Sequence, residues 1–250
     1  MENMNYTYDT ETYYSKWLGI KSELFNNRGL TSVYSEERNI CQLGYPYALK
    51  LLVCVKNNGV TISYGDDTYD KIENLISFIN DDFSFINVKK AIYNTYGITP
   101  NNNIKFVFKH LRNNNIQTIE LTEKHYRLYL DFYKTIHPNY HDIEWVQEYF
   151  NDMVKKSYCH GVICDEKLVS VTDAPTMPYM QNKVQEIGIN TISQYQGKGY
   201  AKEACISCIQ SMIKHGICPQ WSTTEENIAS QNLAYSVGFE KFADWLSLTL

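Results

Sequence analysis

The sequence predicts an α/β protein, and three observations carry that prediction. Strand-like runs rich in β-branched and aromatic residues alternate along the chain with helix-like segments. A hairpin signal, Asn58-Gly59, lies between two apolar runs at 48–56 and 60–64. A third strand-like run, at 184–192, meets a long amphipathic helix through a turn that contains two glycines.

The composition is that of a globular protein, with 44% hydrophobic and 20% charged residues in a chain of 250. That length allows one large domain or two small ones. A formal net charge of −5 argues against nucleic acid or an anionic membrane as a partner, because both need a basic face.

The seven cysteines are odd in number and scattered, which favours reduced thiols over a disulfide framework. Cys205 and Cys208 form a C-x-x-C inside a helical pattern, with no second pair or nearby histidine, so no metal site is predicted. The start of the chain lacks a signal-peptide pattern, and no apolar run reaches the length of a membrane span. We therefore expect a cytoplasmic protein.

The first part of the chain is predicted as an N-terminal α/β domain of unknown role, residues 1–115, and the second as a domain of residues 116–250. Asparagine runs at 101–103 and 113–115 predict turns, and the second marks the boundary. The other elements expected in the first part are an aromatic helix-like segment at Trp17–Phe25, helices at 69–79 and 85–96, and a strand at 104–108.

The second part has a more regular succession of elements. The predicted order is a strand at 116–121, helices that open at Thr122-Glu123 and at about 142, strands at 160–164 and 168–172 around a tight turn, the strand at 184–192, the glycine turn and its helix, and a strand at about 219–224.

The glycine turn has the features of a phosphate-binding site. The apolar stripe of the following helix anchors it to the core, so its first backbone N–H groups are held in place without helical partners. Those N–H groups, the helix dipole and the positive charges of Lys198 and Lys202 all favour an anion. Two glycines can equally make an ordinary tight connection, and that interpretation stays open.

Two other phosphate motifs do not fit this stretch. A P-loop needs a lysine followed by serine or threonine after its last glycine, whereas Gly199 is followed by Tyr200. A dinucleotide fingerprint needs a third glycine where Lys202 stands.

The run E-I-G-I-N-T-I-S-Q-Y-Q-G-K-G-Y-A-K-E-A (186–204) resembles the central motif of the GCN5-related N-acetyltransferases (GNAT), whose cofactor loop reads Q/R-x-x-G-x-G/A. Gln196, Gly199 and Ala201 fill those places. Further on, N-I-A-S-Q-N-L-A-Y-S-V-G-F (227–239) is similar to the second signature of the family, N-x-x-A-x-x-L-Y-x-x-x-G-F. The resemblance covers about residues 116–250.

This resemblance implies a GNAT fold for the second part: a mixed central sheet with splayed parallel strands and helices on both faces. It also implies that acetyl-CoA lies in the gap between the splayed strands at 184–192 and about 219–224. The residues implied as its ligands are Ile189, Asn190 and Thr191 on the strand, Gln196, Gly197, Lys198, Gly199, Tyr200, Ala201 and Lys202 in the turn, and Asn227 at the start of the next helix.

In the implied reaction an amine attacks the thioester directly, and a strand N–H near Ile189 or Asn190 stabilises the oxyanion, worth about 3 kcal/mol. Glu186, at a glutamate position of related acetyltransferases, is the candidate base. Tyr235 is the candidate acid, although the tyrosine of the signature would fall at Ala234.

Three further residues enter the comparison with the family. His160 and Asp173 are lesser catalytic candidates, each with a structural or substrate-facing alternative. The members that acetylate ribosomal proteins carry a glutamate where this chain has Ser222.

The subgroup that the chain resembles most is that of the zwittermicin A resistance-like acetyltransferases, through P-Q-W-S-T-T-E-E-N-I-A-S-Q-N-L-A (219–234). We therefore expect an acetyl-CoA-dependent N-acetyltransferase that acts on a small-molecule amine. A protein or peptide N-acetyltransferase and a non-catalytic acetyl-CoA-binding regulatory module remain as alternatives. A homodimer is left open.

Overall fold

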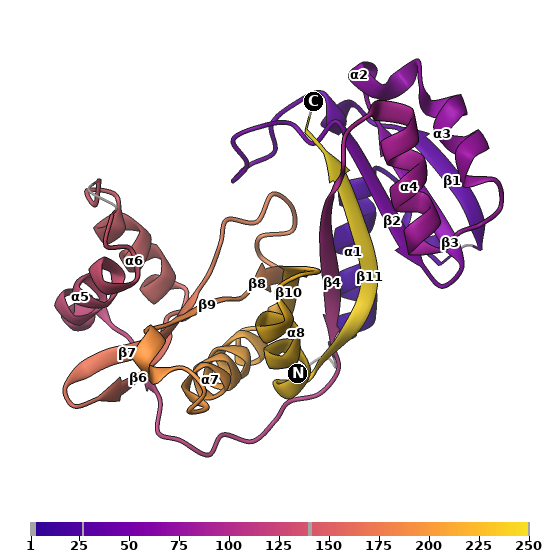
Figure 1. Ribbon diagram of the computed structural model, residues 1–250. Coiled ribbons are helices and arrows are strands. Elements are labelled where there is room, and N and C mark those ends of the chain that lie inside the picture. Colours follow the sequence, from indigo (N-terminus) through magenta and orange to yellow (C-terminus); the bar gives the residue numbers. More distant parts are fainter. Residues whose placement is uncertain (1–3, 27, 140–141, 250) are drawn as a thin grey trace.

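A computed structural model describes residues 4–26, 28–139 and 142–249 of the chain. Within these residues, two sheets diverge from each other and helices cover both faces of the larger one (Figure 1). The larger sheet has the strand order β1-β3-β2-β11-β4-β10-β8 and the smaller has the order β5-β6-β7-β9. The prediction of an α/β fold with a mixed central sheet is confirmed.

The strands are β1 (Gly29–Tyr34), β2 (Leu51–Lys56), β3 (Gly59–Tyr64), β4 (Asn101–Phe108), β5 (Ile119–Glu120), β6 (His160–Cys164), β7 (Lys167–Asp173), β8 (Val184–Glu186), β9 (Gly188–Thr191), β10 (Cys218–Thr224) and β11 (Phe239–Leu248). The α-helices are α1 (Tyr6–Leu18), α2 (Asp66–Tyr69), α3 (Ile72–Ile79), α4 (Phe85–Tyr96), α5 (Tyr126–Ile136), α6 (Val146–Lys155), α7 (Tyr200–Lys214) and α8 (Ile228–Ser236). Short 3₁₀ turns lie at Ser22–Leu24, Glu36–Arg38, Glu123–His125 and Ser193–Tyr195.

The core forms on both sides of β4, because successive side chains of a strand point to opposite faces of the sheet. Ile104, Phe106 and Phe108 pack in one cluster with the apolar stripe of α7. Val107 belongs to a second cluster that α1 completes on the other face. Lys105 faces the same side as Val107, which places a cationic side chain beside the aromatic residues of α1.

The hairpin expected in the first part is confirmed as β2 and β3. Its turn consists of Asn57 and Asn58, with φ of 51° and 62°, while Gly59 already pairs with Lys56 as the first residue of β3. A two-residue hairpin turn of this kind needs positive φ at both positions, and asparagine accepts it better than most residues. The turn therefore lies one residue earlier than the sequence pattern indicated.

The aromatic helix expected at Trp17–Phe25 is wrong, because the helix in this region, α1, spans Tyr6–Leu18. Asn5 caps it by accepting a hydrogen bond from the backbone N–H of Tyr8 at 3.1 Å. Gly19, with a φ of 69°, ends it in the left-handed conformation.

The turn expected at residues 101–103 is also wrong, because these asparagines begin β4. Asn103 pairs with Thr224 of β10 on one side and with Trp245 of β11 on the other. Pairing on both sides outweighs the weak intrinsic strand preference of asparagine.

The two parts of the chain share the larger sheet. β4, which precedes residue 115, hydrogen-bonds to β10 on one edge and to β11 on the other, and both of those strands follow it. The division at residue 115 stays a prediction, and the strand pairing crosses it.

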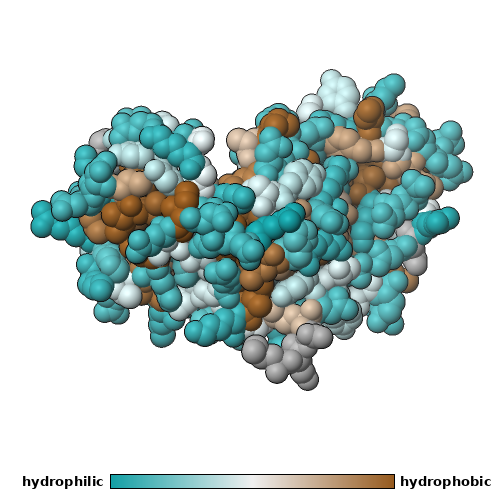
Figure 2. Space-filling model, turned by 90° about the horizontal axis from the view of Figure 1, so that it is seen from below, coloured by the Kyte–Doolittle hydropathy of each residue, from teal (hydrophilic) through white to brown (hydrophobic). Residues whose placement is uncertain are grey.

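The helix α7 connects the two sheets, since it packs against β6, β7 and β9 of the smaller sheet and β10 of the larger. Helices α5 and α6 cover the smaller sheet and form their own cluster with Leu168 and Val171. Seen from below, this lobe is separated from the rest of the surface by a notch (Figure 2). Among the helices of the described residues, none combines the length and apolar composition that a membrane crossing needs.

Candidate active site

The site begins where two parallel strands separate. β8 pairs with β10 from Val184–Cys218 to Glu186–Gln220, and the N–H of Ile187 still donates to the carbonyl of Gln220 at 3.1 Å. From Gly188 onward the chain leaves β10 and pairs instead with β7 as β9. The splayed parallel strands expected from the sequence are thus present, and they open a gap toward the glycine turn.

A cavity of about 730 Å³ occupies this gap. Its walls come from the unpaired edge of β9, the glycine turn, the first turn of α7, the end of β10 and the first turns of α8. The predicted cofactor-binding residues that line it are Ile189, Thr191, Gln196, Gly197, Gly199, Tyr200, Ala201, Lys202 and Asn227. Asn190 and Lys198 are not among the residues that line this cavity.

The backbone of β9 explains the absence of Asn190. In an antiparallel ladder, alternate residues direct both backbone groups toward the same neighbouring strand. The N–H of Ile192 donates to the carbonyl of Val169 in β7, so the backbone groups of Asn190, two residues earlier, also face β7. Ile189 and Thr191 therefore direct their N–H and carbonyl groups toward the cavity, while the side chain of Asn190 lines a different hollow beside α5.

The glycine turn adopts the conformation that a backbone cradle requires. Gly197 and Gly199 have φ of 74° and 84°, in the region that favours glycine. Gly199 is the N-cap of α7 and supplies no side-chain cap, so the N–H groups of the first helical turn are free to bind an anion.

Side chains around the turn hold it and add charge. The amide of Gln196 donates to the carbonyl of Thr191 at 3.2 Å, which ties the turn to the end of β9. The ammonium of Lys198 lies 5.0 Å from the centre of the Tyr195 ring, outside the cavity lining. Lys202 lines the cavity one turn into α7.

The start of α8 forms the opposite wall. Asn227 is its N-cap and accepts a hydrogen bond from the N–H of Ser230 at 3.0 Å, as the sequence predicted. The hydroxyl of Ser230 in turn accepts from the indole N–H of Trp221 at 3.1 Å. The cap therefore fixes the wall of the cavity to β10.

Glu186 lies at the inner end of this cavity, at the last residue of β8. Its side chain is half-buried, and its Oε1 accepts a hydrogen bond from the hydroxyl of Ser222 at 2.6 Å. The same residue lines a second cavity, of about 430 Å³, on the other side of the sheet edge. One carboxylate thus borders both cavities.

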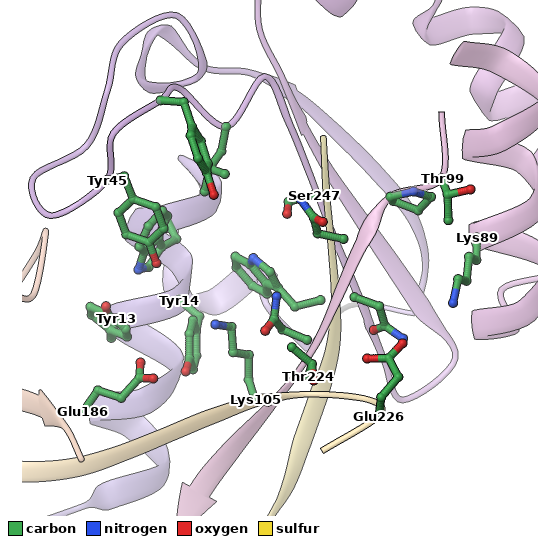
Figure 3. Close-up of a pocket in the computed structure, with 18 residues that line it drawn as sticks. Tyr13, Tyr14, Tyr45, Lys89, Thr99, Lys105, Glu186, Thr224, Glu226 and Ser247 are labelled. Carbon is green, nitrogen blue, oxygen red and sulfur yellow. The ribbon is translucent and has the colours of Figure 1, made fainter. Parts of the chain in front are cut away.

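The second cavity, which we call the aromatic pocket, lies between α1, the loop before β2 and the strands β4 and β11 (Figure 3). The residues that line it and concern its chemistry are Tyr13, Tyr14, Trp17, Tyr45, Lys89, Lys105, Glu186, Glu226 and Trp245. Burial raises the pKa of Tyr45 to about 12, with a smaller contribution from Glu186. The phenols of the pocket therefore stay protonated at neutral pH.

The candidate acid Tyr235 does not line either cavity. It lies on the outer face of α8 with 43% of its surface exposed, and its ring meets that of Phe106 edge-on, with the ring centres 5.5 Å apart. Ala234, at the place of the signature tyrosine, is fully buried. The structure thus brings Glu186 and the glycine turn together, and leaves Tyr235 apart from them.

The lesser candidates His160 and Asp173 serve the smaller sheet. The His160 ring is buried and bonds to Ser207 and to the carbonyl of Ser157, at 2.9 and 3.1 Å. Asp173 accepts a hydrogen bond from Tyr149 and another from the N–H of Ala174 at 2.7 Å. Neither side chain lines the two cavities at Glu186.

Sequence reasoning missed the aromatic pocket and the contact between Ser222 and Glu186. Ser222 drew notice only as a missing glutamate, and a contact over 36 positions leaves no local pattern. A signal for the pocket did exist. Tyr13, Tyr14 and Trp17, together with Thr10 and Leu18, follow the spacing of a buried helix face, which would have placed α1 correctly.

Comparison with solved structures finds proteins of the same fold. An acetyltransferase from the GNAT family of Colwellia psychrerythraea aligns with a TM-score of 0.50 and 16% identity, over 60% of this chain and 56% of the other. A putative GNAT acetyltransferase from Novosphingobium aromaticivorans aligns with a TM-score of 0.45 and 18% identity, over 60% of this chain and 64% of the other. This chain thus spans less than two thirds of the length of either protein.

A third solved structure is that of AAC(6')-Iy, an aminoglycoside N-acetyltransferase, in complex with a bisubstrate analogue of CoA. It aligns with a TM-score of 0.43 and 17% identity, over 50% of this chain and 91% of the other. A search of curated proteins found no match.

The sequence itself matches a family model over most of its length. The model described as GNAT acetyltransferase covers residues 89–246, from α4 to the last strand. This match includes the splayed strands, the glycine turn and β4. The chain belongs to the GNAT acetyltransferase family.

Proposed function

We propose that the protein is an N-acetyltransferase that transfers the acetyl group of acetyl-CoA to a primary amine of a small molecule. The observation that carries this proposal is the continuity of the site. One cavity leads from the glycine turn along the free edge of β9 to Glu186, and the aromatic pocket begins at that same carboxylate. Donor and acceptor can therefore approach one carboxylate from opposite sides.

The residues present fit acetyl-CoA. The free N–H groups from Gly197 to Lys202 suit its pyrophosphate. The carbonyl of Ile189 and the N–H and carbonyl groups of Thr191 suit the amide groups of its pantetheine arm, which would bind along β9 as an added strand.

Bound acetyl-CoA supplies an activated thioester, and the residues of this chain would handle the proton and the charge. Glu186, held by Ser222, is placed to accept the proton of the acceptor ammonium. The N–H of Ile189 faces the cavity and would donate to the oxygen on which negative charge develops. The pKa of an ordinary thiol is about 8.5, so a thiolate is a stable leaving group near neutral pH. The sulfur of CoA can therefore depart without an acid such as Tyr235.

The subgroup, the cellular compartment and the oligomeric state belong to the same proposal. The stretch at 219–234 supports a place near the zwittermicin A resistance-like acetyltransferases. All seven cysteines are free thiols, which supports the reducing cytoplasm as the compartment. Residues of one chain suffice to form both cavities, and a homodimer stays part of this proposal.

The experiment is release of free CoA thiol from acetyl-CoA with a panel of small amines and peptides. The wild-type protein should release thiol with at least one small amine. Gly199→Glu, which fills the cradle with a negative side chain, should abolish release. Gly216→Glu is the matched control, because Gly216 also has positive φ, 74°, lies at the opposite end of α7 and is exposed.

The outcomes separate the alternatives. Release with peptides only would favour a peptide N-acetyltransferase. Saturable acetyl-CoA binding without release on any acceptor would favour a non-catalytic module. Equal loss in both glycine variants would refute the role of the turn.

A further inference from the structure

The aromatic pocket is built largely by the N-terminal part of the chain. Tyr13 and Tyr14 come from α1 and Lys105 from β4 (Figure 3). Glu186 lies at its border with the 730 Å³ cavity of the glycine turn, which we call the donor cavity. The composition of the pocket therefore bears on which amine this protein takes.

One wall of the pocket is aromatic and closely packed. Tyr14 packs against Trp245 with ring centres 5.3 Å apart and against Tyr13 at 5.0 Å. Both tyrosines are buried by at least 97%, with exposed fractions of 1% and 3%. A flat or apolar group of a ligand can pack on such a wall at little cost in side-chain entropy.

Lys105 brings a positive charge into these walls without a direct ion pair. Its Nζ lies 5.8 Å from the ring centres of both Tyr14 and Trp245. Within the described residues, no ion pair joins it to an acidic side chain. Burial lowers the pKa of Lys105, and the nearby charge of Glu186 opposes that effect. An anion beside this ammonium would stabilise its charged form.

A second polar group beside Lys105 also lacks a partner. The hydroxyl of Tyr14 is buried and, in the described part of the chain, has no hydrogen-bond partner. Figure 3 shows Tyr14 between Glu186 and Lys105. A buried hydroxyl without a partner is destabilising, and a polar atom of a ligand would satisfy it.

The other charges that face the pocket lie toward its far end. Lys89 of α4 pairs with Glu225 at 3.5 Å, and Glu226 lies beside it on the loop after β10. Lys105 is thus the cation nearest to the catalytic end, and Glu186 is the carboxylate there. The two charges have opposite signs and border one aromatic wall.

We propose that the acceptor is a zwitterionic amino acid with an aromatic or apolar side chain, which rests on the proposed function. Its amino group lies at Glu186, its carboxylate at Lys105 and the Tyr14 hydroxyl, and its side chain against Tyr14 and Trp245. The amine nitrogen forms a C–N bond with the acetyl carbon while the C–S bond breaks. Before that attack Glu186 takes one proton of the ammonium, and the sulfur then leaves with the electron pair of the broken C–S bond and takes up the second proton that the nitrogen loses. The products are the N-acetyl amino acid and CoA.

The test compares matched pairs of acceptors in the thiol-release assay: phenylalanine with phenethylamine, tyrosine with tyramine, and leucine with isopentylamine. Each pair differs only in the carboxylate. The wild-type protein should use the best amino acid with a kcat/KM at least tenfold above that of its amine, mainly through KM. Lys105→Met should lower the value for the amino acid by 10- to 100-fold and leave that for the amine within about twofold.

Lys109→Met is the control, because Lys109 is an exposed lysine just beyond the same strand and does not line the pocket. Equal or better use of the amines, or an equal effect of Lys105→Met on both members of a pair, would overturn the proposal. If neither member of any pair is turned over, calorimetric titration of the three amino acids into the CoA-bound protein decides. Absence of binding there overturns the proposal.

Acetyl-CoA affinity is measured beside each assay, so that a failure of the proposed acceptor can be distinguished from a failure of the proposed acetyltransferase function. Intact acetyl-CoA binding with no preference for amino acids refutes the substrate class alone. Absence of acetyl-CoA binding by the wild-type protein refutes the proposed function itself.

Discussion

At the scale of single residues, Glu186 has a position that no other carboxylate of the described chain shares, since it lines both the donor cavity and the aromatic pocket. Its hydrogen bond to Ser222 at 2.6 Å restricts the orientation of the carboxylate. A base must be held within hydrogen-bond reach of the proton that it removes. The position and the bond together make Glu186 the residue on which turnover depends most.

We predict that Glu186→Gln lowers kcat by about 10²- to 10⁴-fold, the range of general base catalysis. The amide keeps the size of the side chain and can still bond to Ser222, so acetyl-CoA affinity should change little. Thiol release and calorimetry measure the two effects. Glu240→Gln, at an exposed position of β11, should leave both unchanged. A Glu186→Gln variant with wild-type kcat would remove the residue from the mechanism.

A second residue, His160, couples stability to pH. Burial lowers the pKa of His160 below the ordinary value of 6.5, and the ring stays neutral between Ser207 and the carbonyl of Ser157. Between that lowered pKa and 6.5, the unfolded chain binds a proton that the folded protein does not. The free energy of unfolding therefore falls as the pH falls through this window.

We predict that His160→Gln makes this pH dependence shallower, by up to about 1.4 kcal/mol per pH unit within the window. Urea unfolding at a series of pH values between 5 and 7.5 or so measures it. Asp173 has the opposite effect on stability, because burial raises the pKa of its carboxyl above 3.8. Between 3.8 and that raised pKa the folded protein binds a proton that the unfolded chain does not, so the free energy of unfolding rises as the pH falls. The exposed His110→Gln variant should keep the wild-type slope. An unchanged slope in His160→Gln would contradict the assignment.

Most of the proposed cofactor residues that line the cavity could be found from the sequence because their signal is local backbone geometry. Gly197 and Gly199 need positive φ, and Asn227 caps the helix that it begins, so residue type and spacing reveal them. Tyr235 could not be judged in this way. One residue along a helix turns a side chain by about 100°, and here that rotation directs it to the outer face of α8.

At the scale of elements, the short strand β9 has two different edges. One pairs with β7 through Asn190 and Ile192, and the other, which carries the backbone groups of Ile189 and Thr191, faces the donor cavity. Adjacent residues of one strand therefore differ in position: the backbone groups of the first face the cavity, and those of the second hold the sheet.

We predict opposite effects for proline at these two neighbours. Ile189→Pro removes the N–H that faces the cavity, so kcat should fall by about 10²- to 10³-fold, while stability stays close to wild type because an edge strand tolerates proline there. Asn190→Pro removes a ladder donor and should lower the free energy of unfolding by about 1–3 kcal/mol. Kinetics and urea unfolding on both variants test this contrast, and a reversed order would show that the ladder register is wrong.

Element type was easiest to predict where the pattern is long and periodic, as for α7 and the hairpin of β2 and β3. The prediction failed at Asn101 to Asn103, which favour turns. Pairing of all three with β11, and of Asn103 also with β10, imposes an extended conformation there. The prediction also failed at α1, whose start depends on a single cap, Asn5, and whose end depends on Gly19. Tertiary pairing and capping decide such cases, and local composition does not.

At the scale of the whole molecule, β4 ties the chain together. It lies between β10 and β11, which follow it by more than a hundred positions, and α1 and α7 cover its two faces. The aromatic pocket exists because of this arrangement, since Tyr14, Lys105 and Glu186 come from distant segments. No local pattern in the sequence could have predicted that meeting.

We predict that the protein unfolds in a single cooperative transition in urea, with fluorescence and circular dichroism giving the same midpoint. A fragment of residues 116–250 should fail to fold, because β10 and β11 would lack the strand between them. Two separate transitions, or a stable fragment with acetyl-CoA affinity, would instead support independent domains divided at residue 115.

The measurement that tests the central claim most directly is a calorimetric titration of acetyl-CoA into the wild-type protein, Gly199→Glu and Gly216→Glu. The claim is that the glycine turn at the start of α7 and the free edge of β9 form the donor site. The account predicts saturable one-site binding to the wild type and to Gly216→Glu, and none to Gly199→Glu. Binding that survives in Gly199→Glu, or that is absent from the wild type, would contradict it.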